Sequence, residues 1–125
     1  MTTNRALDVQ VKRVYDDPEP ADGARVLVDR LWPRGLAKDR AGLDAWDKEP
    51  APSDELRRWY GHDPARFEEF ADRYRQELTT ADGLAALDRL RDRARTGRLT
   101  LLTATKDLPH SHATVLADVL TSGRA

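Results

Sequence analysis

The chain of 125 residues contains no cysteine. It can therefore form no disulfide, offer no thiolate nucleophile and build no zinc site on sulfur. Long hydrophobic runs are missing as well: the opening residues MTTNRALDVQVKRV lack the apolar stretch of a signal peptide, and no segment approaches the length needed to cross a bilayer. These absences predict a cytoplasmic protein with no membrane partner.

An excess of charge of either sign is also missing, since 21 lysines and arginines face 22 aspartates and glutamates. This balance gives no general basic field that would draw the protein to nucleic acid or anionic lipid, so any anion site must be local. Lysine is scarce, because it occurs only at positions 12, 38, 48 and 106 and the other 17 of the 21 basic residues are arginine. Arginine suits phosphate and carboxylate recognition, although GC-rich coding explains such a bias too.

The hydrophobic pattern predicts a single α/β domain that spans residues 1–125, a length that supports one core. The first strand alternates apolar and polar residues, and two other strands are continuous apolar runs of the kind buried on both faces. Strands are expected over residues 7–14, 26–28, 43–47 and 99–102.

Helix signals fill the rest of the chain. Ser53, Asp63 and Asp82 each precede a helical pattern in the position of an N-cap, and Gly61 is placed to end the first of these helices. A last helix is expected to open near Pro109.

The order of strands, helices, strand and helix favours a single-layer, mostly parallel sheet of three or four strands flanked by helices. The segment DDPEPADG between the first two strands is shorter than most parallel crossovers. An antiparallel hairpin therefore remains an alternative for that pair.

Polar residues follow every predicted strand. In a parallel sheet these residues would meet at the carboxyl edge, where open α/β sheets bind ligands, although strand ends are often polar simply because loops are solvated. The residues expected to form a site at this edge are Arg13, Asp29, Arg30, Arg34, Lys106, Asp107 and His112.

The segment LTLLTATKDLPHSH, residues 99–112, carries the strongest signal, because an apolar strand runs directly into titratable residues at a helix start. Lys106 and the free backbone N–H groups there would hold an anion, whereas a structural interpretation makes Asp107 an N-cap beside solvated histidines. His112 is the candidate general acid or base, because imidazole titrates near neutrality. Asp29 would orient an arginine or accept a hydrogen bond from a ligand hydroxyl.

The sequence contains no motif that supports a metal site or a catalytic nucleophile. His110 and His112 are two residues apart, so on a helix they point to different faces, and no HExxH spacing is present. Ser111 has no GxSxG context. The sequence therefore predicts no metal, no cofactor and no hydrolytic triad.

The leading hypothesis is a protein that binds a small anionic ligand, phosphorylated or nucleotide-like, at the carboxyl edge of the sheet. The alternative is a non-catalytic interaction module, associated with nucleic acid, in which Arg13, Arg30 and Lys106 pair with Asp29 and Asp107 in a structural salt-bridge network. Nucleic acid is not favoured as a partner. Whether a reaction follows binding, and whether the protein is oligomeric, stay open.

Five stretches resemble one known family in order along nearly the whole chain. They are VKRVYDDP, RVLVDRLWPRGL, APSDELRRWYGHDP, FEEFADRYRQEL and LLTATKDLPHSHATVL. Through them the chain is similar to the YeaO-like family, domain of unknown function 488, and the resemblance implies a compact α/β fold with parallel strands. It implies no activity.

Longer relatives in that family carry cysteine in the segment that begins here with Thr103, together with a lysine, an aspartate and a histidine where Lys106, Asp107 and His112 stand. The layout also resembles rhodanese and low-molecular-weight phosphatase loops. Those loops need a cysteine nucleophile, and this chain has none.

Overall fold

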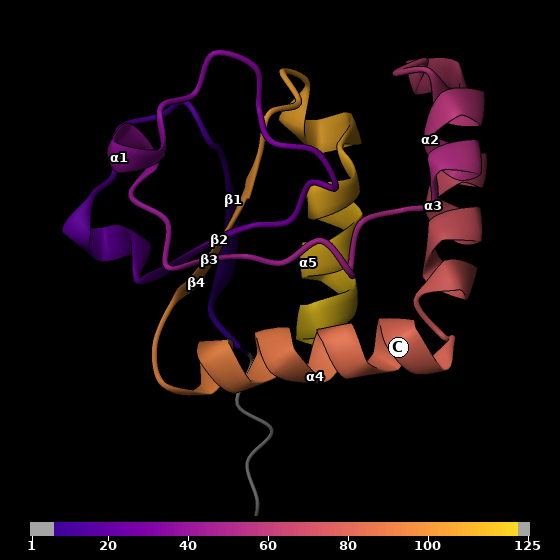
Figure 1. Cartoon of the computed structure of the whole chain (residues 1–125). Helices are drawn as coiled ribbons and strands as arrows, with labels where there is room; N and C mark the ends of the chain where they lie inside the picture. Colours follow the sequence, from indigo (N-terminus) through magenta and orange to yellow (C-terminus); the bar gives the residue numbers. More distant parts are fainter. Residues whose placement is uncertain (1–6, 123–125) are drawn as a thin grey trace, which may run out of the picture.

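A four-stranded parallel sheet lies at the centre of the protein. The structure, a computed structural model, describes residues 7–122, and the strands follow the order β1-β4-β2-β3 with every neighbouring pair parallel (Figure 1). The predicted α/β class is confirmed, and the hairpin alternative for the first two strands is wrong. The strands are β1 (Val9–Arg13), β2 (Ala24–Leu27), β3 (Ala45–Trp46) and β4 (Leu99–Thr103).

The connection from β1 to β2 explains how so short a segment makes a parallel crossover. Residues 14–23 contain no α-helix and only one 3-10 turn, Pro20–Asp22. Extended chain covers about 3.3 Å per residue, so this segment can return along the five-residue strand β1 without a helix. Strand β4 fills the place between β1 and β2.

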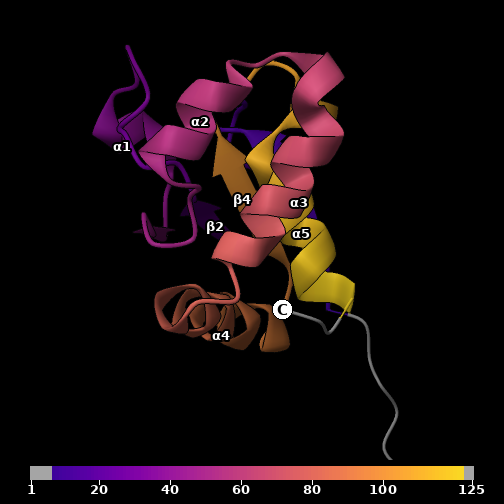
Figure 2. The ribbon, with the colours of Figure 1, turned by 90° about the vertical axis from the view of Figure 1, so that its right-hand side faces the viewer.

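Helices cover one face of the sheet. Helix α5 contacts β1 and β4, α4 contacts β4 and α5, and α3 packs on α5 and α2. Figures 1 and 2 show α2 and α3 on the side of α5 that faces away from the sheet, with α4 running across one end. Among residues 7–122 no helix is long and apolar enough to cross a membrane. The helices on this face are α2 (Asp54–Tyr60), α3 (Phe67–Glu77), α4 (Ala81–Arg95) and α5 (His112–Ser122).

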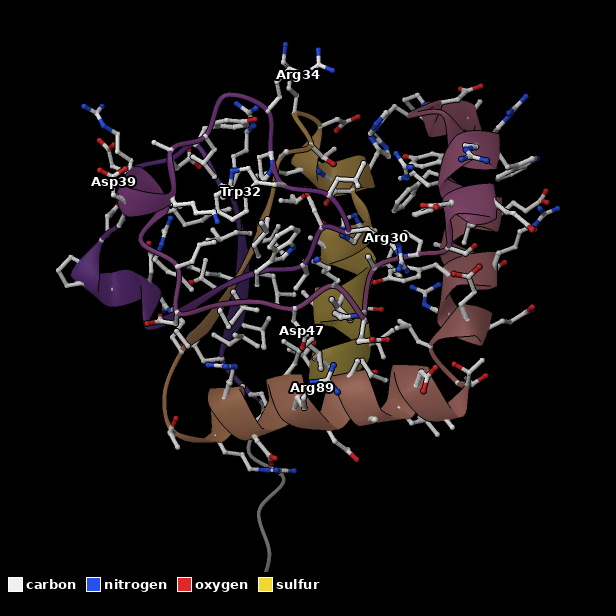
Figure 3. All side chains as sticks on the ribbon, viewed as in Figure 1. Arg30, Trp32, Arg34, Asp39, Asp47 and Arg89 are labelled. Atoms are coloured by element: carbon white, nitrogen blue, oxygen red, sulfur yellow. The ribbon has the colours of Figure 1, made fainter. Side chains whose placement is uncertain are left out.

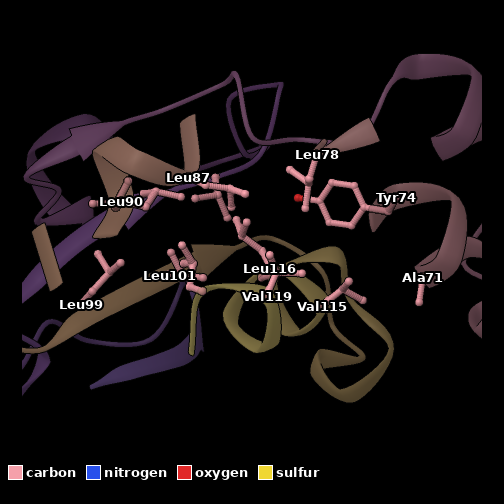
Figure 4. Close-up of a cluster of buried hydrophobic side chains, with 14 of the residues drawn as sticks. Ala71, Tyr74, Leu78, Leu87, Leu90, Leu99, Leu101, Val115, Leu116 and Val119 are labelled. Carbon is pink, nitrogen blue, oxygen red and sulfur yellow. The ribbon is translucent and has the colours of Figure 1, made fainter. Parts of the chain in front are cut away.

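The main core lies between these helices and the sheet. Leu99 and Leu101 alternate along β4 toward the helices, where they join Leu87 of α4 and Leu116 of α5 (Figure 4). Tyr74 of α3 extends the same cluster and is fully buried. Burying side chains of this size contributes about 1.5–3 kcal/mol each, so this face supplies much of the stability.

Irregular segments and the short helix α1 (Lys38–Ala41) cover the other face. Leu27 and Leu102 of the sheet pack there against Trp32 and Trp46, whose rings meet edge to face at 5.3 Å. This second, smaller core fixes the segment that follows β2.

Two predicted helix starts are confirmed and one is corrected. The Ser53 hydroxyl accepts from the backbone of α2, and the Asp63 carboxylate accepts in the same way just before α3. Gly61, with φ 54°, ends α2 as expected. Helix α4 is capped by Thr80 and not by Asp82, because α4 begins at Ala81 and Asp82 therefore lies inside its first turn.

The last helix also begins later than predicted. Pro109 lies in a 3-10 turn, and α5 begins only at His112. The hydroxyl of Ser111, whose backbone is extended, accepts from the N–H of Thr114 at 3.3 Å and so occupies the N-cap position. The residues Ser122 and Gly123 predict that this helix frays at its end; Ser122 still belongs to α5, and Gly123 lies outside the described residues.

A buried ionic cluster joins the start of β2 to the neighbouring strands. Asp22, 2% exposed, accepts hydrogen bonds from Lys12 at 3.0 Å, Gln10 at 3.2 Å and Arg25 at 2.5 Å, and from the backbone N–H of Glu19 at 3.1 Å. Burial alone would raise the pKa of Asp22, but the bonds from Lys12, Glu19 and Arg25 together lower it to about 2. We call Asp22, Arg25, Lys12 and Gln10 the Asp22 cluster.

Arg25 is as fully bonded as its carboxylate partner. Its side chain, 4% exposed, also donates to the carbonyl oxygens of Ala41 and Gly42, each at 3.1 Å. The Thr100 hydroxyl of β4 donates to the Asp22 carbonyl at 2.6 Å. Each of these buried polar groups therefore has a partner within the fold.

Candidate ligand-binding site

A cavity of about 290 Å³ opens at the carboxyl ends of β2 and β4. Its walls come from three stretches, residues 29–34 after β2, residues 51–62 around α2 and residues 104–112 between β4 and α5, and from Phe70 of α3. Open parallel sheets bind ligands at this edge. The charged and titratable residues that line this pocket are Asp29, Arg30, Arg34, Arg57, His62, His110 and His112.

Asp29 and His112 form a close pair at the inner end of the pocket. One carboxylate oxygen of Asp29 accepts from the backbone N–H of Ala104 at 2.8 Å. The other, Oδ1, is buried, lies 3.4 Å from His112 Nε2 and has no hydrogen-bond partner among the described residues. His112 Nε2 lies 3.0 Å from the Val28 carbonyl oxygen. Because a carbonyl oxygen can only accept, Nε2 must carry a proton.

Burial is the main influence on the His112 imidazole. It lowers the pKa of His112 below its usual value, and the nearby Asp29 carboxylate and the bond to Val28 only partly oppose this. The ring of Tyr74 packs edge-on against it at 6.0 Å. The folded protein therefore favours the neutral imidazole.

Arg30 follows Asp29 and bridges the sheet edge to the segment before α2. Its Nη2 donates to the carbonyl oxygens of Ala51 at 3.1 Å and Pro52 at 3.4 Å. Its Nε is buried without a hydrogen bond and lies 4.0 Å from the Asp54 carboxylate. Figure 3 shows Arg30 between the sheet and α2. Arg30 thus has donor capacity that the fold leaves unused.

Arg34 and Arg57 stand at the rim. Arg34 is exposed and points away from the body of the protein (Figure 3), while its loop is held by a 2.7 Å hydrogen bond from the Tyr15 hydroxyl to the Arg34 carbonyl oxygen. Arg57, 46% exposed, lies 3.3 Å from Asp54. With Arg30 these residues set three arginines against one lining carboxylate, while Asp54, outside the lining, pairs with Arg30 and Arg57.

Aromatic residues and two more histidines complete the walls. Tyr60 donates its hydroxyl to the His110 carbonyl oxygen at 2.6 Å, and burial, helped by the charge of Asp107, raises the pKa of Tyr60. The His110 ring lies 2.7 Å from Asp107 and packs edge-on against Phe67. His62 has φ 57°, a left-handed backbone conformation that is uncommon outside glycine.

The hydroxyls of the pocket are already engaged. The Ser111 hydroxyl donates to the Leu108 carbonyl oxygen at 2.7 Å, and the Thr105 hydroxyl accepts from Thr103 at 3.2 Å. Within the described part of the chain, no three His, Asp or Glu side chains gather in an arrangement that could hold a metal ion.

Sequence reasoning identifies part of this site. Four of the predicted residues, Asp29, Arg30, Arg34 and His112, line the pocket together. Arg57 was not predicted. Its only signal is the Ser53 cap, which places Arg57 one turn into α2, and its approach to β2 depends on how that helix packs.

The other three predicted residues lie outside the pocket lining. Arg13 donates to the Ala104 carbonyl oxygen at 3.4 Å, and its guanidinium lies over the ring of Tyr15. Lys106 is exposed, and Asp107 faces His110. In the described residues neither Asp29 nor Asp107 pairs with Arg13, Arg30 or Lys106, so the salt-bridge network of the alternative hypothesis does not form at this edge.

Comparison with known proteins assigns the chain to a family. A family model described as the inactive DUF488-N3 subclade matches residues 8–124. An uncharacterised protein of Mycobacterium tuberculosis (strain ATCC 25618 / H37Rv) is 51% identical over 118 residues, which cover 93% of this chain and 96% of that protein. The uncharacterised protein YeaO of Escherichia coli (strain K12) is 45% identical over 116 residues, covering 93% and 99%. No solved structure gives a significant match. The chain therefore belongs to the YeaO-like DUF488 family.

Proposed function

We propose that this protein binds a small phosphorylated anion in the pocket at the carboxyl edge of its sheet, and that it acts as a binding protein. The observation that carries the proposal is the set of three arginines around a cavity of about 290 Å³ that contains only one lining carboxylate. We expect this binding to take place in the cytoplasm.

The arginines suit an anion in both charge and geometry. Arg34 and Arg57 reach the rim from different segments, and Arg30 keeps an unbonded Nε behind them. A guanidinium presents its donors as a planar fork that matches phosphate oxygens. Each hydrogen bond to a charged group contributes about 1.5–3 kcal/mol, so two such contacts are enough for measurable affinity.

The size of the pocket favours a small ligand. Its volume of about 290 Å³ is at the lower end of ligand pockets, which range from about 300 to 1,000 Å³. One phosphate with a compact attached group fits that volume better than a dinucleotide.

Several observations favour binding over chemistry. The Ser111 and Thr105 hydroxyls are engaged in hydrogen bonds, and the His112 Nε2 proton is directed to the Val28 carbonyl oxygen. His112 therefore serves better to tie α5 to the end of β2 than to transfer a proton. The description of the matching family as an inactive subclade agrees with this role.

Titration with phenyl phosphate, followed by calorimetry and by backbone amide NMR, tests the proposal. We expect shifts confined to the pocket lining, which is residues 29–34, 51–62 and 104–112 together with Phe70, and an affinity at least about tenfold weaker in Arg57→Gln, because one charged fork is lost. Arg93→Gln is the matched control, since Arg93 is an exposed arginine on α4 that does not line the pocket.

Two results would overturn the proposal. One is a pocket that does not respond to millimolar phenyl phosphate or that binds it equally well in both variants. The other is release of inorganic phosphate by the protein, which would show catalysis instead of binding.

A further inference from the structure

Much of the pocket wall is apolar, although its rim is cationic. Tyr60 and Phe70 form part of the lining, and their rings stack on each other at 4.2 Å. Pro52 and Trp32 add further apolar surface. A bare phosphate ion has no apolar surface to pack against this wall. Burying apolar surface is favourable only when another apolar group covers it.

Leu31 adds an exposed apolar side chain to the same lining. It is 63% exposed, more than the other large hydrophobic residues found exposed in the described chain, Tyr15 and Leu84 at 41% each. A single exposed leucine has no meaning by itself. This one lies between Arg30 and Trp32 and lines the cavity, so a ligand in the pocket would cover it.

The position of the carboxylate indicates which part of a ligand points inward. Asp29 lies with His112 at the inner end of the pocket, and its Oδ1, 3.4 Å from the imidazole that burial keeps neutral, has no hydrogen-bond partner among the described residues. A phosphate pushed to that end would meet a like charge away from bulk water. At the rim it would meet Arg34 and Arg57 and keep part of its hydration.

We infer that the ligand is a phosphomonoester whose carbon part is a compact apolar group, with a phenyl ring as the model. This inference rests on the proposed function and names the class of ligand. The phosphate lies at the rim between Arg34 and Arg57. The apolar group enters between Leu31 and the aromatic surface of Tyr60 and Phe70.

Three probes of the same charge type test this assignment: inorganic phosphate, glycerol phosphate and phenyl phosphate. We expect phenyl phosphate to bind at least about tenfold more tightly than the other two, because only its ring removes apolar surface from water. Equal affinities, or tighter binding of glycerol phosphate, would overturn the inference. If Arg57→Gln still weakened the binding of these probes, the proposed function would stand without the inference about the ligand class. If no probe bound at all, both the proposed function and the inference would be wrong.

A substitution at the mouth of the pocket locates the apolar contact. In Leu31→Ser we expect the affinity for phenyl phosphate to fall about threefold or more while that for inorganic phosphate is unchanged, since only the ring contacts this side chain. Leu84→Ser is the control, because Leu84 is also exposed but lies on α4 outside the lining. Equal preference for phenyl phosphate in Leu31→Ser and the unmodified protein would overturn the placement of the ring.

Discussion

Asp22 and Asp29 stand at opposite ends of β2, one just before the strand and one just after it, and the fold treats them differently. Asp22 accepts from Lys12, Gln10, Arg25 and a backbone N–H. Asp29 accepts from one backbone N–H on one oxygen, and its other oxygen is buried without a bond. The nearby arginines differ in the same way, since Arg25 is fully bonded, whereas the buried Nε of Arg30 has no hydrogen bond in the described chain and only a 4.0 Å contact with Asp54.

This difference separates an end of β2 whose buried charges are bonded within the fold from an end that keeps buried polar atoms without hydrogen bonds. A buried polar atom without a partner costs about 1–3 kcal/mol, and folded proteins leave few of them. The amino end of β2 has satisfied its buried charges. The carboxyl end of β2 keeps two such atoms, Asp29 Oδ1 and Arg30 Nε, on residues that line the pocket, and the third in the described chain, Arg13 Nε, belongs to the end of β1 outside the lining.

Asp22→Asn should have the largest effect on the free energy of unfolding. It tests whether the amino end of β2 is the end that stabilises the fold. It removes the only carboxylate bonded to the buried Arg25 guanidinium among the described residues, and loss of one partner of a buried ion pair costs about 3–5 kcal/mol. Denaturant unfolding measures the loss. A decrease of less than about 1 kcal/mol would show that the cluster is not a determinant of stability.

Acid unfolding should show the contribution of the Asp22 cluster to stability, with a free-energy change somewhat smaller than that of Asp22→Asn. Since the pKa of Asp22 is lowered from 3.8 to about 2, its ionised form stabilises the folded state fully above about pH 4. That contribution, about 2 kcal/mol, is lost as the pH falls from about 4 to about 2. The stability difference between the unmodified protein and Asp22→Asn should narrow over this range, and a constant difference would contradict the prediction.

Asp29→Asn should cost far less, about 1 kcal/mol or below, because an amide oxygen can still accept from Ala104 and the second carboxylate oxygen has no bond to lose. The same change should lower the pKa of His112 further, since the Asp29 charge opposes the effect of burial. Histidine NMR titration and denaturant unfolding measure the two effects. A loss of stability as large as that of Asp22→Asn would show that the carboxylates at the two ends of β2 stabilise the fold equally.

The smallest effect on the free energy of unfolding should be a dependence on pH that is due to His112. Because its pKa is lowered in the folded state from 6.5, the unfolded chain takes up a proton more readily. Stability is therefore full above about pH 6.5 and decreases as the pH falls below it. His112→Gln should remove this slope, whereas His62→Gln should only reduce it, because the charge of His62 is the smallest contribution to the lowered pKa of His112. Persistence of the slope in His112→Gln would assign it to another group.

The sequence predicts features that depend on near neighbours along the chain. An apolar run predicted β4, a serine and a glycine predicted both ends of α2, and the strand-end rule predicted Asp29, Arg30 and Arg34, which line one pocket. Features that depend on strand order were not predicted. Arg13 ends a strand and Arg30 follows one, but β4 separates β1 from β2, so Arg13 lies beside Tyr15 and outside the pocket lining.

The Asp22 cluster shows the same limit. Asp22 belongs to the segment DDPEPADG, which has the composition of an exposed turn. Its burial comes from β1, β2 and β4 together, which supply Lys12, Arg25 and Thr100. No local sequence pattern predicts that three strands will supply side chains around the turn that contains Asp22.

The position of β4 in the middle of the sheet has a consequence for synthesis. Val9 is paired with Leu99, and both β1 and β2 take β4 as a neighbour. A ribosome adds about 5–20 residues per second, so β1 waits on the order of ten seconds for the only strand it pairs with in the described chain. The nascent segment that contains β1 and β2 must therefore remain unaggregated without its sheet, and the sheet is completed only after β4 has been synthesised.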